Sequence, residues 1–117
     1  MPMPVQLVPH TNVWVEREGN VVLSRWRVQL LEAIRETGSI SAAARRMDVE
    51  YHRAWEKLEE MERGLGQQLV ERQAGGPHGG GASLTEAALG YVERFNAFAR
   101  DLDDEIAARF EHWFAEG

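Results

Sequence analysis

The side chains best suited to chemistry in this sequence are cationic and hydrogen-bonding groups gathered between residues 39 and 57. They are hydroxyls, guanidinium groups, an imidazole and an ammonium group: Ser39, Ser41, Arg45, Tyr51, His52, Arg53 and Lys57. Such groups bind phosphate oxygens, and arginine also reaches the hydrogen-bonding edges of bases. A solvated helix surface would carry similar residues, so the elements that hold them decide between the two interpretations.

Residue types that would support catalysis or metal binding are missing or poorly spaced. The sequence has no cysteine, and its four histidines, at 10, 52, 78 and 112, show neither HxH nor HxxxH spacing, which argues against a zinc site. The carboxylates of residues 101–105 would spread around a helix instead of forming an acid–base pair. We therefore expect no enzyme activity, no metal and no cofactor.

The chain also lacks the features of a membrane or secreted protein. No apolar run approaches the roughly 20 residues of a membrane span, and the first residues lack the basic region of a signal peptide. We expect a cytoplasmic protein without a membrane partner.

Hydrophobic periodicity and capping residues place the candidate groups on a helical scaffold. Two short strands, Asn12–Arg17 and Val21–Leu23, are followed by a helix that Ser24 caps and Gly38 ends near Thr37. A very short helix is predicted after a cap at Ser41. A third helix is predicted from residue 50 or 51 to Arg63, with Ala54, Leu58 and Met61 on its buried face and Gly64 and Gly66 ending it.

The next segment predicts a small β wing and a long helix. Gln68–Arg72 is predicted to pair with Ser83-Leu84 across the loop QAGGPHGGGA, in which glycine fills five of ten positions. A glycine-rich loop can bind an oxyanion through backbone N–H groups, but the Lys-Ser/Thr ending of phosphate loops is absent, so we favour a flexible wing. Thr85 then caps a helix that extends to about Phe114.

Two short helices joined by a tight turn, with small alanines in the first, are typical of a helix-turn-helix, whose second helix presents its N-terminal residues to the major groove. The predicted fold is mainly α with a small β wing: a winged helix-turn-helix over residues 1–84, including an N-terminal hairpin, and a long dimerisation helix over residues 85–117. The wing adds four candidate DNA-binding residues: Arg72, His78, Gly79 and Gly80.

Several of these segments resemble the winged helix-turn-helix domain of ModE-type regulators, which are related to the LysR type. The matching points lie within residues 24–100 and include SISAAA at 39–44, YxxAW at 51–55 and the glycine pattern at 75–81. Glu50 and Pro77-His78 depart from the pattern, which usually has a serine and a cation there. Full-length ModE proteins continue into a molybdate-binding region, whereas this sequence ends at Gly117. The resemblance therefore implies the DNA-binding domain alone, and the molybdate response of the family does not carry over to this sequence.

The last helix carries an apolar stripe with a coiled-coil-like spacing of three and four residues. Its members are Ala88, Val92, Phe95, Ala99, Leu102, Ile106, Phe110 and Trp113. A helix about 45 Å long outruns a winged-helix body, so we expect a second copy of the chain to cover this stripe, which makes the protein a homodimer.

The charge distribution leaves two functional hypotheses. The net charge of −6 arises mostly from residues 85–117, which hold three basic and eight acidic groups, whereas residues 24–84 hold nine of each. Because charges beyond ~8–10 Å are screened, the neutral block can still present a basic face. We favour a sequence-specific, homodimeric DNA-binding transcriptional regulator. The alternative is a winged-helix module for protein interaction or small-ligand (oxyanion) sensing that has lost tight DNA binding. The sequence indicates no particular effector.

Overall fold

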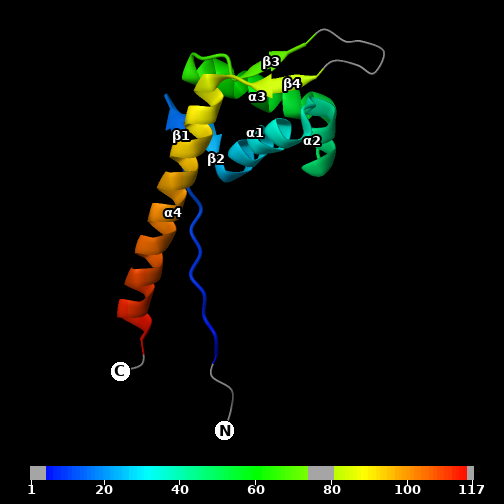
Figure 1. Ribbon diagram of the computed structural model, residues 1–117. Coiled ribbons are helices and arrows are strands. Elements are labelled where there is room, and N and C mark those ends of the chain that lie inside the picture. The colour runs from blue at the N-terminus through cyan, green and yellow to red at the C-terminus, as the bar shows by residue number, and fades with distance from the viewer. Residues whose placement is uncertain (1–4, 74–80, 116–117) are drawn as a thin grey trace.

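Three helices and two small antiparallel sheets gather at one end of the molecule, and a long helix runs away from them (Figure 1). A computed structural model of the chain describes residues 5–73 and 81–115. The elements in chain order are β1 (Trp14–Arg17), β2 (Asn20–Ser24), α1 (Arg25–Thr37), α2 (Ile40–Arg46), α3 (Tyr51–Leu65), β3 (Val70–Arg72), β4 (Ala82–Leu84) and α4 (Glu86–Phe114). This architecture confirms the predicted fold class.

The N-terminal hairpin forms because its turn residues adopt the backbone conformation that a two-residue turn requires. Glu18 and Gly19 have φ angles of 53° and 82°, in the left-handed region used by tight hairpin turns. The hairpin matches the prediction, but β1 begins at Trp14 rather than at Asn12. The strand β2 extends one residue further at each end than Val21–Leu23.

Local capping contacts fix the helix starts, and one of them corrects the prediction. Ser24 and Thr85 cap α1 and α4 as expected, since each side chain accepts a hydrogen bond from a backbone N–H three residues later. The cap of α2 is Ser39, whose hydroxyl oxygen accepts from the Ala42 N–H at 3.1 Å. Ser41 was the predicted cap but lies inside the helix, because Ile40 is already helical and buried in the core.

The end of α3 is also later than predicted. Gly66, with a φ of 66°, ends the helix, whereas Gly64 lies inside it. A Cβ atom on Gly64 would lie 2.2 Å from Val22 Cγ1, so this glycine allows β2 to approach α3 closely. Its role is tertiary packing rather than helix termination.

The core lies between α1, α3 and the start of α4, and the base of the wing closes it. Its largest fully buried side chains are Leu30, Leu31, Ile34, Leu58, Met61, Leu69 and Val28. The Ala82 N–H donates to the Gly38 carbonyl at 2.8 Å, and Glu62 accepts from the Leu69 and Val70 N–H groups at 2.8 and 3.2 Å. These hydrogen bonds fix the base of the wing to the body. The strand β3 starts at Val70, two residues later than the predicted start at Gln68.

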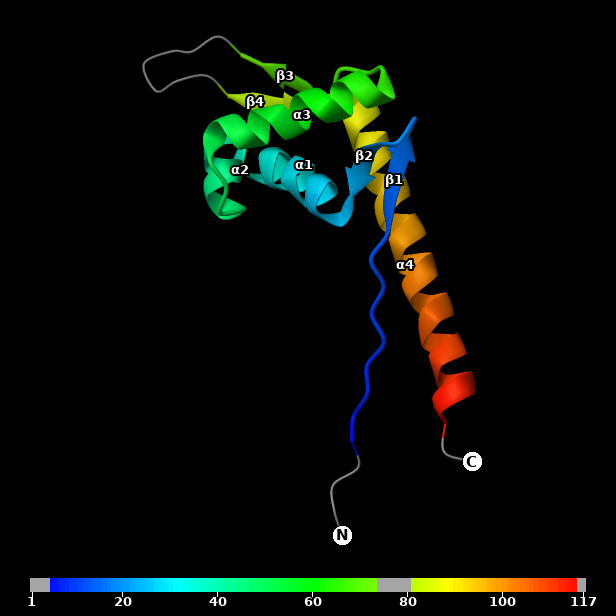
Figure 2. The same cartoon turned by 180° about the vertical axis from the view of Figure 1, so that it is seen from behind.

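The long helix α4 belongs to the core along its first half only. Ala88, Val92, Phe95 and Ala99 are at most 6% exposed, and the Asn96 amide donates to Glu32 of α1 at 2.6 Å. The second half runs beside the N-terminal segment, away from the other helices (Figure 2). Because the chain itself covers these four apolar side chains, the prediction that the whole stripe forms a dimer interface is wrong for them.

Candidate nucleic-acid interface

The helices α2 and α3 form the helix-turn-helix through close contact of small side chains. Ala43, Ala44 and Ala54 are at most 2% exposed, and side chains this small let α2 and α3 pack closely. Between them Asp48 adopts a φ of 55°, and the Val49 N–H donates to the Ala44 carbonyl at 3.0 Å. This turn sets the angle at which the first turn of α3 faces solvent.

The first turn of α3 exposes three of the predicted DNA-binding residues. Tyr51, His52 and Arg53 are all exposed, and the His52 side chain is 70% accessible. The carboxylate of Glu50 lies 3.3 Å from His52 Nδ1. The residue that departs from the ModE pattern therefore contacts a predicted base-reading side chain and partly offsets its positive charge when the imidazole is protonated.

An aromatic and cationic stack joins the wing to α3. The guanidinium carbon of Arg72, on β3, lies 3.8 Å from the centre of the Trp55 ring, and Trp55 meets Tyr51 edge to face at 6.4 Å between ring centres. A cation over an indole face is attracted by the ring quadrupole. Arg72, predicted as a DNA contact, is therefore held beside the first turn of α3.

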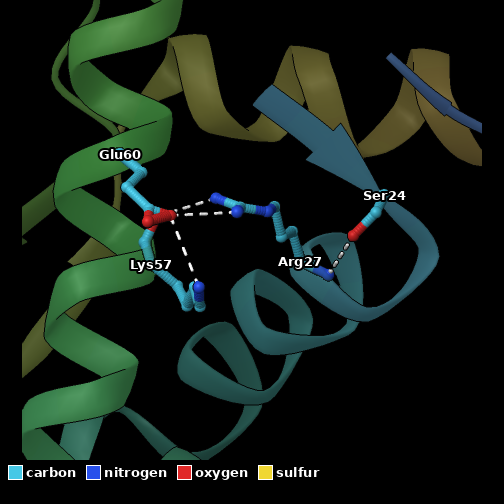
Figure 3. A network of polar contacts seen from close by, with 4 residues as sticks. All are labelled: Ser24, Arg27, Lys57 and Glu60. Carbon is cyan, nitrogen blue, oxygen red and sulfur yellow. Dashed lines mark hydrogen bonds and ion pairs between the residues drawn. The ribbon is translucent and has the colours of Figure 1, made fainter. Parts of the chain in front are cut away.

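Lys57 lies on another side of α3 and is less available than the residues of the first turn. Its ammonium nitrogen is 3.5 Å from Glu60, and the same carboxylate receives a hydrogen bond from Arg27 of α1 at 3.0 Å (Figure 3). Partial burial alone would raise the pKa of Glu60, but the hydrogen bond and charge of Arg27, with a smaller contribution from Lys57, lower it below its ordinary value. Glu60 therefore partly neutralises Lys57, which leaves Lys57 less available to a DNA phosphate than the residues of the first turn.

The predicted groups of α2 lie near the start of the helix and along its exposed face. Ser39 accepts a hydrogen bond as the helix cap, while Ser41 and Arg45 are exposed. Arg46 forms an ion pair with Glu36, whereas Arg45 has no ion pair among the residues that the structure describes. Of the predicted wing residues, His78, Gly79 and Gly80 lie outside the described residues.

The sequence pattern did not predict two groups of surface residues. Arg17 on β1 and Arg63 on α3 line a groove between the hairpin and α3, which only the tertiary structure brings together. Three apolar residues of the N-terminal segment, Val5, Leu7 and Val8, are 58–82% exposed. The available signal was a short apolar group, VQLV, in a proline-containing segment with no helix or strand pattern.

The fold and its exposed helix define a winged helix-turn-helix DNA-binding domain, and comparison with known proteins assigns its family. Residues 26–89 match the family of bacterial regulatory helix-turn-helix proteins, lysR family. The chain belongs to this family and is a ModE-like regulator domain.

Two relatives and one solved structure show where the similarity lies. The chain is 37% identical over 97 residues to the molybdenum transport protein ModE of Azotobacter vinelandii, covering 83% of this chain and 34% of that protein. It is 39% identical over 74 residues to the transcriptional regulator ModE of Haemophilus influenzae, covering 63% and 29%. The DNA-binding domain of CbnR, solved as a complex with DNA, superimposes with a TM-score of 0.54 at 28% identity, covering 71% of this chain and 94% of that domain. The chain spans about a third of the length of these two ModE relatives.

No helix within residues 5–73 and 81–115 is both long and apolar enough to cross a membrane.

Proposed function

We propose that this chain binds specific sequences of double-stranded DNA as a homodimer and regulates transcription in the cytoplasm, without enzyme activity. The observation that supports this most directly is the exposed first turn of α3, with Tyr51, His52 and Arg53 beside a wing held by the Arg72–Trp55 stack. A recognition helix reads bases with its N-terminal residues, while contacts to phosphates fix its register. In this arrangement α3 enters the major groove, and the start of α2 and the wing contact the backbone.

The homodimer is supported by the second half of α4. Leu102, Ile106 and Phe110 are half-buried and Trp113 is 78% exposed, so the chain covers this part of the stripe only in part. A contiguous exposed apolar patch of this kind is typical of an interaction site. A second copy supplies the same surface by two-fold symmetry and places two recognition helices for the two halves of a palindromic site.

Selection of binding sites from a random duplex library tests DNA recognition. The unmodified protein is expected to recover a palindromic motif and to bind it with an affinity that falls steeply as salt rises. Failure to enrich any motif at low salt, with the dimer intact, would remove the regulator assignment.

Sedimentation of Phe110→Asp beside Ala108→Asp tests the dimer. Residue 110 lies on the stripe and residue 108 lies on the opposite side of α4 by helical spacing. Phe110→Asp is expected to give a monomer, because it places a carboxylate within an apolar seam, and Ala108→Asp is expected to stay dimeric. A monomeric unmodified chain at tens of micromolar would contradict the proposal.

The alternative, a protein-interaction or oxyanion-sensing module, is favoured by the acidity of the chain and by the Glu50 carboxylate beside His52. The same selection experiment separates the two functions, because this alternative recovers no DNA motif.

A further inference from the structure

A cationic groove lies on the side of α3 that faces the N-terminal hairpin. It encloses about 660 Å³ and is lined by four basic side chains, Arg17, Arg27, Lys57 and Arg63, and by two acidic ones, Glu18 and Glu60. The helical spacing of residues 57, 60 and 64 puts the groove on one side of α3, whereas Tyr51 and Trp55 share the side that meets the wing.

The positive charge of the groove exceeds what its carboxylates neutralise. Arg27 and Lys57 both contact the single carboxylate of Glu60, at 3.0 and 3.5 Å. Arg17 and Arg63 form no ion pair among the described residues, and Glu18 is the only other acidic residue in the lining. The groove therefore carries a net charge of +2, four positive against two negative, although the whole chain carries −6.

The groove is held open by contacts between the hairpin and α3. Arg17 Nη1 donates to the Gly64 carbonyl at 2.9 Å, which uses one of the five N–H donors of its guanidinium. Gly64 allows Val22 to pack against the helix, since a Cβ atom there would lie 2.2 Å from Val22 Cγ1. Arg27 is 9% exposed and is fixed by Glu60 (Figure 3). A preformed cationic site binds an anion without first ordering its side chains.

We propose that the β1–β2 hairpin is a second wing, and that Arg17 and Arg63 bind a phosphate of the DNA backbone in this groove while α3 lies in the major groove. The inference rests on the proposed function. Arginine suits this role, because its planar guanidinium group forms paired hydrogen bonds with phosphate oxygens. The recognition helix is then flanked by backbone contacts on both sides, from β3–β4 and from the hairpin.

The test measures how the affinity of the full chain for its selected duplex depends on salt. Arg17→Ala and Arg63→Ala each change both protomers of the proposed homodimer. Each is therefore expected to reduce the slope of log K against log salt by about one per protomer, about two for the dimer, where the phosphate contact is lost. Affinity falls equally for the selected and a scrambled duplex, so the preference between them stays unchanged. Arg100→Ala is the matched control, since Arg100 is exposed on α4 and lies away from the apolar stripe by helical spacing. Its slope is expected to equal that of the unmodified protein.

Thermal unfolding and the Arg63→Ala variant distinguish a lost phosphate contact from a disturbed hairpin. Arg17→Ala removes a contact to Gly64, so thermal unfolding of each variant separates loss of the hairpin from loss of a phosphate contact, and Arg63→Ala tests the groove without that contact. Unchanged slopes in both variants, with tight binding by the unmodified protein, would overturn the second wing and leave DNA binding intact. Absence of DNA binding by the unmodified protein would overturn the proposed function and this inference with it.

Inorganic phosphate distinguishes a DNA contact from a site for a free anion. The melting temperature of the unmodified protein is compared in phosphate and in chloride at equal ionic strength. A phosphate-specific rise that Arg17→Ala abolishes, together with unchanged salt slopes on DNA, would assign the groove to a small anion and contradict the proposal.

Discussion

Arg53 is the exposed cation in the first turn of α3 that the structure leaves most available for base contact, with no ion pair among the described residues. We predict that Arg53→Ala costs about 1–3 kcal/mol of binding free energy and relaxes preference at one base pair per half-site if the guanidinium pairs with a guanine. A contact to phosphate alone would instead lower affinity evenly across sequences. Binding-site selection with both proteins, followed by titration of the recovered duplexes, separates these outcomes. Unfolding should be unaffected, because the side chain lies outside the core.

The carboxylate of Glu60 makes the stability of the fold depend on pH in the acid range. Arg27 from α1 and Lys57 from α3 contact its carboxylate, and Arg17, Glu18 and Arg63 share the groove. Partial burial opposes ionisation, but Arg27 and, to a smaller extent, Lys57 hold the pKa of Glu60 below its ordinary value of 4.5. A lowered folded-state pKa stabilises the fold above the unfolded-state pKa, and this stabilisation is lost as the pH falls through the folded-state value.

We therefore predict that Glu60→Gln makes the loss of melting temperature between about pH 5 and pH 3 less steep. The effect should be modest, since the side chain is 39% exposed and solvent screens its ion pairs. Glu93→Gln, a change at an exposed carboxylate of α4, is the control and should leave the acid limb unchanged. An acid limb for Glu60→Gln identical to that of the unmodified protein would show that the Arg27 contact does not stabilise the fold.

At the scale of elements, the sequence predicted well what local contacts determine. Ser24, Gly38 and Thr85 were found as helix boundaries because a cap hydrogen bond or a left-handed glycine needs only neighbouring residues. Ser39 and Ser41 are equally good caps by type, and burial of Ile40 decides between them. The role of Gly64 depends on Val22, far away in the sequence, so no local pattern could reveal it.

The glycines of α3 and α4 provide a paired prediction on helix packing. Gly64→Ala should destabilise the fold by about 1–3 kcal/mol, reduced by the better helix propensity of alanine, because its Cβ atom would overlap Val22. Gly90→Ala should be neutral or stabilising by up to about 1 kcal/mol, since its Cβ atom would meet only the end of the Arg94 side chain at 3.3 Å. Chemical denaturation measures both, and equal effects would mean that the hairpin does not pack tightly on α3.

At the scale of the whole molecule, periodicity revealed the apolar side of α4 but not what covers it. The stripe continues with similar spacing from Ala88 to Trp113, yet the body of the chain buries it only as far as Ala99. The basic groove was likewise hidden, because its arginines come from the hairpin, α1 and α3, and only the fold brings them together. The first turn of α3 was predictable, since one helix carries all its residues.

Three hydrogen bonds among Thr11, Arg25 and Asp103 join the N-terminal segment to α4, and this cluster gives the last prediction. Arg25 donates to Asp103 at 3.1 Å and to Thr11 at 3.2 Å, and the Thr11 hydroxyl donates to the same carboxylate at 3.3 Å. Asp104, the next residue along α4, has no ion pair within the described part of the chain. Asp103→Asn should therefore release residues 5–12 from α4, seen as lower backbone NMR order parameters across that segment, whereas Asp104→Asn should not.

The variants Asp103→Asn and Asp104→Asn also test whether the second half of α4 lies away from the DNA. Each variant removes one negative charge, but these carboxylates lie on the half of α4 that runs away from α3 (Figure 2). Screening is nearly complete beyond ~8 Å at physiological salt, so both variants should keep the site preference of the unmodified protein and change affinity only slightly. An altered site preference in Asp104→Asn would mean that the acidic half of α4 contacts the DNA and that α3 is presented from another direction.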